Sequence, residues 1–151
     1  MISVKSARLI RQKLVNQKSY IDELGPYVAL EYTDYQRRPG YNRIVERLVQ
    51  IIVESAIDIN EKLIEAMNEP PPASARESFG AMSRLGVLDD GVASAFQAYV
   101  GLRNRIVHAY EKLDNHIVYF NAKRLLDDAE RYVMAVQRFV DQNQQETGES
   151  E

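Results

Sequence analysis

The clearest structural signal in the chain is residues 43–67, which read RIVERLVQIIVESAIDINEKLIEAM. Apolar side chains recur there every three or four positions, the period of one face of an α-helix: Ile44, Leu48, Ile52, Ala56, Ile59, Leu63 and Met67. Four further apolar residues widen this stripe: Val45, Val49, Ile51 and Val53. The pattern predicts a long central helix that is buried on more than one side.

The rest of this helix surface carries an acidic ridge, made of Glu54, Asp58, Glu61 and Glu65. Such a ridge has two interpretations. It is most often a face that water solvates, and less often a face on which a partner protein docks. The sequence favours the first and leaves the second open.

On the N-terminal side, residues 4–24 have apolar positions partly at helical spacing, and Gly25-Pro26 is expected to interrupt them. A short amphipathic stretch, residues 27–36, then stops before Pro39-Gly40. Tyrosines gather in and just after this stretch, at Tyr27, Tyr32, Tyr35 and Tyr41. They are suited to core packing and, as a second interpretation, to an aromatic lining.

On the C-terminal side, three prolines at 70–72 must end the central helix, because proline lacks an amide hydrogen and clashes with the preceding turn. Ser74 and Glu77 fit a capping box for a short helix that ends near Gly86. Asp89-Asp90 starts another helix, and Asp114 caps a last one over residues 117–141.

These elements predict an all-α fold, an up-and-down-like bundle of five to six helices. Residues 1–141 form one domain in this interpretation, and residues 142–151 form a flexible polar tail. The length of 151 residues and the shares of apolar (45%) and charged (27%) residues are ordinary for one globular domain.

Composition also limits the function. The chain has no cysteine, no apolar run near the roughly 18 residues of a membrane span, and no visible signal peptide, so we expect a cytoplasmic protein without membrane contact. The net charge of −3 argues against a broadly basic nucleic-acid coat protein. Two histidines without organised carboxylates predict no metal site, and we expect no cofactor.

Residues 103–110, RNRIVHAY, hold the side chains best suited to chemistry. His108 can move a proton near neutral pH, and Arg103 can hold a phosphate with two parallel hydrogen bonds. Together they suffice for cutting RNA without a metal. Asn104 can orient the histidine or bind the substrate, and Arg105 either contacts flanking phosphates or is simply solvated. The competing interpretation is a helix end with a capping histidine and a paired arginine.

Helical geometry raises a problem for this site. Five residues turn an α-helix by about 500°, so Arg103 and His108 lie about 140° apart, whereas Asn104 and His108 are neighbours. Three routes remove the mismatch: the helix unwinds near His108, the long arginine side chain wraps around, or two copies of the helix face each other. A two-fold dimer achieves the third without extra sequence.

The spacing of Arg103, His108 and Tyr110 resembles the R-x4-H-x-Y signature of the HepT-type HEPN ribonuclease toxins. The segments 78–89 and 116–119 also look like this family, and so does the central helix from Arg43-Ile44-Val45-Glu46-Arg47 to Ile57-Asp58-Ile59. The resemblance covers nearly the whole chain and is weakest in the first forty residues. It implies a HEPN-like helical domain that forms a homodimer, with both motifs in one composite cleft.

The resemblance further implies an endoribonuclease toxin of a toxin–antitoxin pair that cleaves RNA and leaves a 2′,3′-cyclic phosphate. His108 would transfer the proton and Arg103 would stabilise the phosphate charge. Tyr110 would accept AMP from a cognate MntA-type nucleotidyltransferase antitoxin, which would place bulk and negative charge beside the arginine. His116 is expected at the surface, with a smaller chance of touching RNA.

A second function belongs to a different class. The chain would then be a non-catalytic helical partner that holds a nucleotidyltransferase, and the arginine and histidine would be structural. Growth arrest upon expression of the chain alone, lost in His108→Ala, separates the two hypotheses. The sequence does not name the RNA target.

Overall fold

The computed structural model describes residues 1–108 and 113–146. Six α-helices make up this part of the chain: α1 (Val4–Ala29), α2 (Tyr32–Arg37), α3 (Tyr41–Ala66), α4 (Ala75–Arg84), α5 (Asp90–His108) and α6 (Asn115–Asn143). Within it there is no strand, and the only β contact is an isolated bridge between Ile2 and Gln144. The predicted all-α bundle is therefore confirmed. No described helix is both long and apolar enough to cross a membrane.

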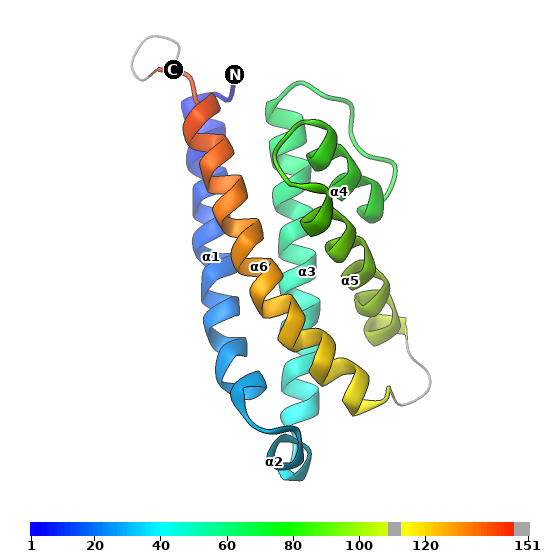
Figure 1. Ribbon diagram of the computed structural model, residues 1–151. Helices are drawn as coiled ribbons and strands as arrows, with labels where there is room; N and C mark the ends of the chain where they lie inside the picture. The colour runs from blue at the N-terminus through cyan, green and yellow to red at the C-terminus, as the bar shows by residue number, and fades with distance from the viewer. Residues whose placement is uncertain (109–112, 147–151) are drawn as a thin grey trace.

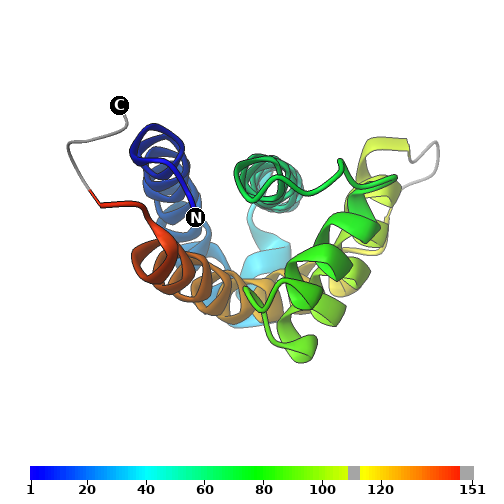
Figure 2. The same ribbon diagram turned by 90° about the horizontal axis from the view of Figure 1, so that it is seen from above.

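Helix α3 is the centre of the bundle and packs against all five other helices. Seen along the bundle, α3 lies between α1 and the α4–α5 pair, and α6 runs along one side (Figures 1 and 2). Val45, Val49 and Val53 are fully buried together with Ile52, Ala56 and Ile59, so the helix is buried on more than one side, as predicted. Ile44 is an exception: 40% of it is exposed.

Helix α3 starts at Tyr41, two residues before the predicted start. Gly40 stands immediately before it with φ of +84°, a left-handed conformation that glycine adopts without a steric cost. This residue turns the chain sharply between α2 and α3, so the Pro39-Gly40 stop was predicted correctly.

The predicted interruption at Gly25-Pro26 is wrong, because α1 continues through Pro26 to Ala29. A proline inside a helix removes one backbone hydrogen bond and costs about 3 kcal/mol. Packing offsets this cost: Leu24 and Val28 lie on either side of Pro26 and both are buried. The Tyr119 hydroxyl on α6 also donates to the carbonyl of Leu30, just beyond the end of α1. Tertiary contacts therefore override a local stop signal.

The predicted helix caps at Ser74 and Asp114 are confirmed, but the capping box at Ser74 forms only in part. Ser74 Oγ accepts from the Glu77 amide at 3.1 Å, although the Glu77 carboxylate reaches the amide of Ala73 and not that of Ser74. Asp114 Oδ1 accepts from the His116 amide at 2.8 Å, and α6 begins at Asn115, two residues before the predicted start. These caps fix where α4 and α6 begin.

The last helix runs past the predicted end at residue 141. Helix α6 continues to Asn143, and Ile2 hydrogen-bonds to both Asn143 and Gln145 through its backbone. Ile2 is fully buried. The two ends of the described chain therefore meet, and the ordered structure includes residues that we assigned to the tail. Residues 147–151 lie outside the described part.

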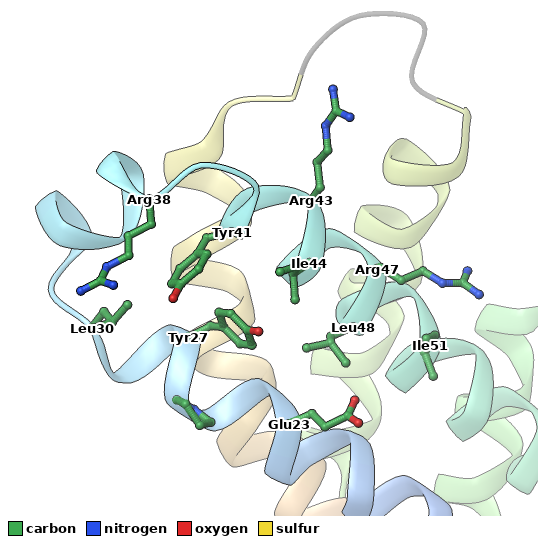
Figure 3. A pocket seen from close by; sticks show the side chains of 11 residues that line it. Glu23, Tyr27, Leu30, Arg38, Tyr41, Arg43, Ile44, Arg47, Leu48 and Ile51 are labelled. Atoms are coloured by element: carbon green, nitrogen blue, oxygen red, sulfur yellow. The ribbon is translucent and has the colours of Figure 1, made fainter.

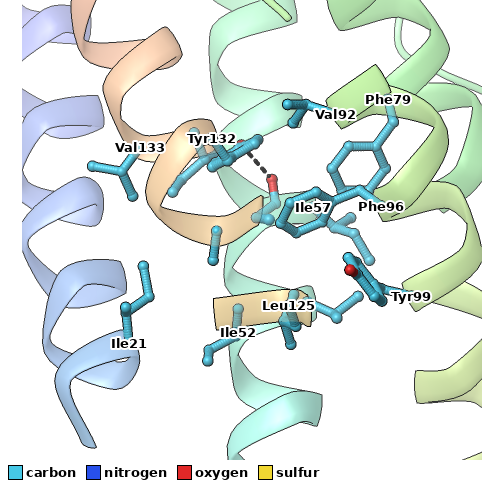
Figure 4. Packing of buried hydrophobic residues seen from close by; sticks show 14 of the residues in the cluster. Ile21, Ile52, Ile57, Phe79, Val92, Phe96, Tyr99, Leu125, Tyr132 and Val133 are labelled. Atoms are coloured by element: carbon cyan, nitrogen blue, oxygen red, sulfur yellow. Dashed lines mark hydrogen bonds between the residues drawn. The ribbon is translucent and has the colours of Figure 1, made fainter. Parts of the chain in front are cut away.

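An aromatic cluster joins α4, α5 and α6 in the core (Figure 4). The ring centroids of Phe79 and Phe96 lie 5.1 Å apart, and those of Phe96 and Tyr132 lie 5.2 Å apart. The buried Tyr132 hydroxyl lies 2.6 Å from Oδ1 of Asn60, whose Nδ2 donates to Ser78 Oγ at 2.9 Å. This network satisfies the side chains of Tyr132, Asn60 and Ser78 and ties α6 and α4 to the central helix.

Candidate functional site

The predicted motif lies in the last turns of α5. The buried face of this helix runs through Val92, Phe96 and Tyr99 at helical spacing. Leu102 continues this face and is buried, and Ile106 packs partly against the core. Arg103, four residues after Tyr99, lies between them on the same face. An arginine therefore occupies a place where the pattern calls for an apolar side chain.

Arg103 is half-buried, and its Nε atom is inaccessible to solvent without a hydrogen-bond partner among the described residues. No carboxylate in that part of the chain forms an ion pair with it. A buried donor without a partner costs about 1–3 kcal/mol. The structural alternative, an arginine paired with a carboxylate, therefore has no support within residues 1–108 and 113–146.

One helical turn before Arg103, α5 is attached to α6. The Tyr99 hydroxyl donates to Asp128 Oδ2 at 2.5 Å, and Arg131 lies 3.4 Å from the other carboxylate oxygen. Burial raises the pKa of Tyr99 well above its usual value, and the bond to Asp128 raises it further. Tyr99 therefore stays neutral and keeps donating across the physiological pH range, which holds this part of α5 in place.

The other three predicted side chains of α5 are exposed: Asn104, Arg105 and His108. Asn104 and His108 are four residues apart on a continuous helix and hence are neighbours on one face. The helix is regular up to His108, its last residue. Between Arg103 and His108 the described helix does not unwind, so these two side chains of one chain remain about 140° apart around the helix. Residues 109–112 lie outside the described part. Within the described helix, side-chain wrapping and pairing of two copies are the routes that remain.

Tyr110 lies outside the described residues, so its predicted role stays a prediction. His116 lies in the first turn of α6, exposed as expected. Its ring centroid is 4.5 Å from that of Phe120 and 5.2 Å from that of Tyr32. In the part of the chain that the structure describes, no three or more His, Cys, Asp or Glu side chains gather as metal ligands would.

The acidic ridge is not a uniform free surface. Asp58 accepts from Lys13 of α1 at 2.5 Å, and Glu54 accepts from Gln50 at 2.8 Å. Glu61 and Glu65 are exposed. The ridge is thus partly used to hold α1 against α3, and its role in docking a partner stays a prediction.

A groove of about 920 Å³ lies between α1 and α3 (Figure 3). Arg38, Arg43 and Arg47 line it together with Tyr27 and Tyr41. The sequence alone predicts RNA contacts only around Arg103 and Arg105. The four-residue spacing of Arg43 and Arg47 placed them on one helix face, but nothing in the sequence placed Tyr27 opposite them.

The protein is similar over most of its length to known ribonucleases. A family model described as ribonuclease HepT-like matches residues 18–136. The tRNA nuclease HepT of Aphanizomenon flos-aquae is 27% identical over 121 residues, which cover 80% of this chain and 82% of the relative. The mRNA nuclease HepT of Shewanella oneidensis is 28% identical over 85 residues, 56% of this chain and 64% of the relative.

Solved structures show the same fold. A tri-AMPylated HEPN toxin from Shewanella oneidensis, in complex with an MNT antitoxin, superposes with a TM-score of 0.77 at 22% identity, over 85% of this chain and 96% of the toxin. The cytosolic protein YutE of Bacillus subtilis, of unknown function, superposes with a TM-score of 0.75 at 14% identity, over 87% of this chain and 91% of YutE. Because the family model spans most of the chain, the chain belongs to the HepT-like ribonuclease family.

Proposed function

We propose that this protein is a metal-independent endoribonuclease toxin that cuts RNA with Arg103 and His108. The observation that carries the proposal is Arg103 itself. Its half-buried side chain interrupts an apolar stripe, with no ion pair among the described residues and with Nε unbonded. A cation kept partly dehydrated and without a partner is ready to bind an anion, because a phosphate would supply the missing acceptors.

The reaction is an internal transesterification. A base removes the proton of the ribose 2′-hydroxyl, the 2′-oxygen attacks the adjacent phosphorus, and the bond to the 5′-oxygen breaks as that oxygen takes up a proton. A 2′,3′-cyclic phosphate remains on one fragment and a 5′-hydroxyl on the other. His108 transfers protons, and Arg103 stabilises the negative charge on the phosphoryl oxygens. Asn104 orients His108 or the substrate, and Arg105 contacts flanking phosphates.

The active form is a homodimer in which Arg103 of one copy meets His108 of the other. Two observations support this arrangement. The continuous helix leaves the two side chains of one copy about 140° apart. Apolar side chains are also exposed where α5 ends and α6 begins: 43% of Val107, 36% of Ile117 and 40% of Phe120. A two-fold contact there would cover them and bring the two motifs together.

A nucleotidyltransferase antitoxin of the MntA type controls the toxin by transferring AMP to Tyr110. Tyr110 follows His108 by two residues, so a nucleotide on it would add negative charge beside the site. A structural neighbour of this chain is an AMPylated HEPN toxin in complex with an MNT antitoxin, which supports the same control here.

The test is cleavage of purified tRNA and of mRNA transcripts by the purified protein in the presence of EDTA. We expect cleavage by the wild type, loss of cleavage in His108→Ala and in Arg103→Ala, and full cleavage by Arg138→Ala, a control arginine that is exposed on α6. Mass spectrometry of the fragments should find 2′,3′-cyclic phosphate ends. Cleavage that survives His108→Ala or requires a divalent metal would contradict the mechanism.

The same set of variants tests the alternative of a non-catalytic partner. In that case the purified wild type would leave every RNA intact, and expression of the chain alone would not arrest growth. Binding to a nucleotidyltransferase would then persist in His108→Ala and Arg103→Ala.

A further inference from the structure

The groove between α1 and α3 combines positive charge with aromatic walls. Tyr27 of α1 and Tyr41 of α3 pack edge to face against each other and together form an aromatic wall of the groove, with 5.0 Å between their ring centroids. Leu30 and the exposed Ile44 extend the apolar surface. Figure 3 shows these side chains around the hollow, with the guanidinium groups of Arg43 and Arg47 extending outward from α3, away from α1.

Within residues 1–108 and 113–146, no ion pair neutralises the arginines of this groove. Arg38, Arg43 and Arg47 are exposed, and none forms an ion pair with a described residue. Arg38 instead lies over the ring of Tyr41, 5.8 Å from its centroid. Glu23 is the one acidic side chain in the lining, against three arginines. In a chain with a net charge of −3, this local excess of positive charge needs an explanation.

The positive charge is confined to one end of the α1–α3 seam. A second cavity, about 320 Å³, shares Arg47 and Ile51 with the groove and continues along the same two helices. Its lining contains Glu54 and Asp58, and its Lys13 is already paired with Asp58. The basic part therefore ends near Arg47. It lies toward α2, at the same end of the bundle as the end of α5 and the start of α6 (Figure 1).

We propose that the basic groove, defined by Arg38, Arg43, Arg47, Tyr27 and Tyr41, binds the single-stranded RNA that flanks the cleaved phosphodiester. This inference rests on the proposed function. Arg43 and Arg47 contact successive phosphates, and a base packs against Tyr27 and Tyr41. Free arginines beside aromatic rings are the combination with which proteins hold single-stranded nucleic acid irrespective of sequence.

Other occupants fit the groove less well. A second copy placed there by two-fold symmetry would bring the same arginines against each other, because such an interface apposes identical patches. An apolar helix would leave Arg43 and Arg47 without counter-charges. A polyanion with flat bases satisfies both the cations and the rings.

The experiment measures binding of fluorescein-labelled oligouridylate by fluorescence anisotropy over a range of salt concentrations. The protein is the full chain with His108→Ala, which prevents cleavage. Each phosphate contact to single-stranded nucleic acid contributes about 0.7 to the slope of log K against log salt. The double variant Arg43→Ala/Arg47→Ala should lower the slope by about 1.4 and weaken binding about 25-fold at ~0.1 M salt.

Two control variants show whether binding depends on arginines at these positions or on positive charge in general. Arg138→Ala removes one positive charge from the exposed surface of α6 and should leave both affinity and slope unchanged. Arg43→Lys/Arg47→Lys keeps the charges and should retain most of the slope. In the cleavage-competent chain, Arg43→Ala/Arg47→Ala should raise KM for tRNA and leave kcat nearly unchanged, because the groove lies outside the reacting centre.

The outcomes distinguish this inference from the proposed function. If the wild type cleaves RNA but the arginine variants bind and cleave as the control does, the groove proposal is wrong and the ribonuclease stands. If the variants instead change the mass of the assembly in light scattering, the groove is a protein interface and not an RNA site. If the wild type does not cleave RNA and the His108→Ala chain does not bind it, both proposals fail.

Discussion

The Tyr99 hydroxyl of α5 donates a hydrogen bond to Oδ2 of Asp128 on α6, with 2.5 Å between the two oxygens. Tyr99 is one helical turn before Arg103 and is buried, and Asp128 is held on its other side by Arg131. The bond therefore fixes the part of α5 that presents the proposed site. It is a charge-assisted bond in a poorly solvated place, where removal of one partner is costly.

We expect Tyr99→Phe to lower the free energy of unfolding by about 1.5–3 kcal/mol, because it removes a hydrogen bond to a carboxylate and keeps the ring. Urea denaturation followed by circular dichroism measures this. Tyr20→Phe is the control, since Tyr20 is only partly buried and its hydroxyl forms no hydrogen bond with a described residue. Equal stabilities of the two variants would show that the Asp128 bond contributes nothing.

Arg103→Leu should separate stability from activity. Leucine fits the apolar stripe of Phe96, Tyr99 and Ile106, and the substitution removes a buried donor that has no partner among the described residues. We expect the free energy of unfolding to stay equal or to rise by up to about 1 kcal/mol, while RNA cleavage is lost. A variant that is much less stable than the wild type would mean that Arg103 has a structural partner.

Arg103→Lys should also cleave poorly, although its charge is retained. A single ammonium group cannot reproduce the planar fork with which a guanidinium holds two phosphate oxygens. We expect a loss similar to that in His108→Ala, about 10²–10⁴ in rate. Single-turnover cleavage of tRNA provides the comparison, and near-normal rates for Arg103→Lys would assign the residue a purely electrostatic role.

The protein should lose stability at alkaline pH. Burial raises the pKa of Tyr35 from 10.0 to about 12, and it raises those of Tyr99 and Tyr132 as well. In the unfolded chain these tyrosines ionise near pH 10, so the unfolded state then binds fewer protons than the native state, and stability falls as pH rises. For Tyr35 this loss should extend from about pH 10 to about pH 12. The urea midpoint in this range should fall less in Tyr35→Phe.

Tyr110→Phe should leave ribonuclease activity nearly intact and make the toxin resistant to its antitoxin, because only the acceptor oxygen is removed. Incubation with the MntA-type antitoxin, ATP and magnesium should add one or more AMP masses to the wild type and none to the variant. Full neutralisation of the variant, with no mass shift on the wild type, would contradict this control. The acidic ridge of Glu54, Asp58, Glu61 and Glu65 would then be the first surface to test for docking.

The sequence by itself determined the helices and their order, because helical periodicity and capping act between residues three or four positions apart. The stripe of Val45, Val49 and Ile52, the cap at Ser74 and the left-handed Gly40 are all local signals. It also placed Arg103 and His108 on one helix at an angle that a single copy does not bring together, and the regular α5 agrees with this.

Only the tertiary structure decided what happens where distant segments meet. Pro26 predicts the end of a helix, but α1 continues through it because packing holds the buried Leu24 and Val28 on either side. The burial of Arg103 Nε away from any partner among the described residues depends on how α5 packs in the bundle, and the contact of Tyr27 with Tyr41 depends on how α1 packs against α3. Such burial and proximity arise between side chains far apart in the chain, so no local pattern encodes them.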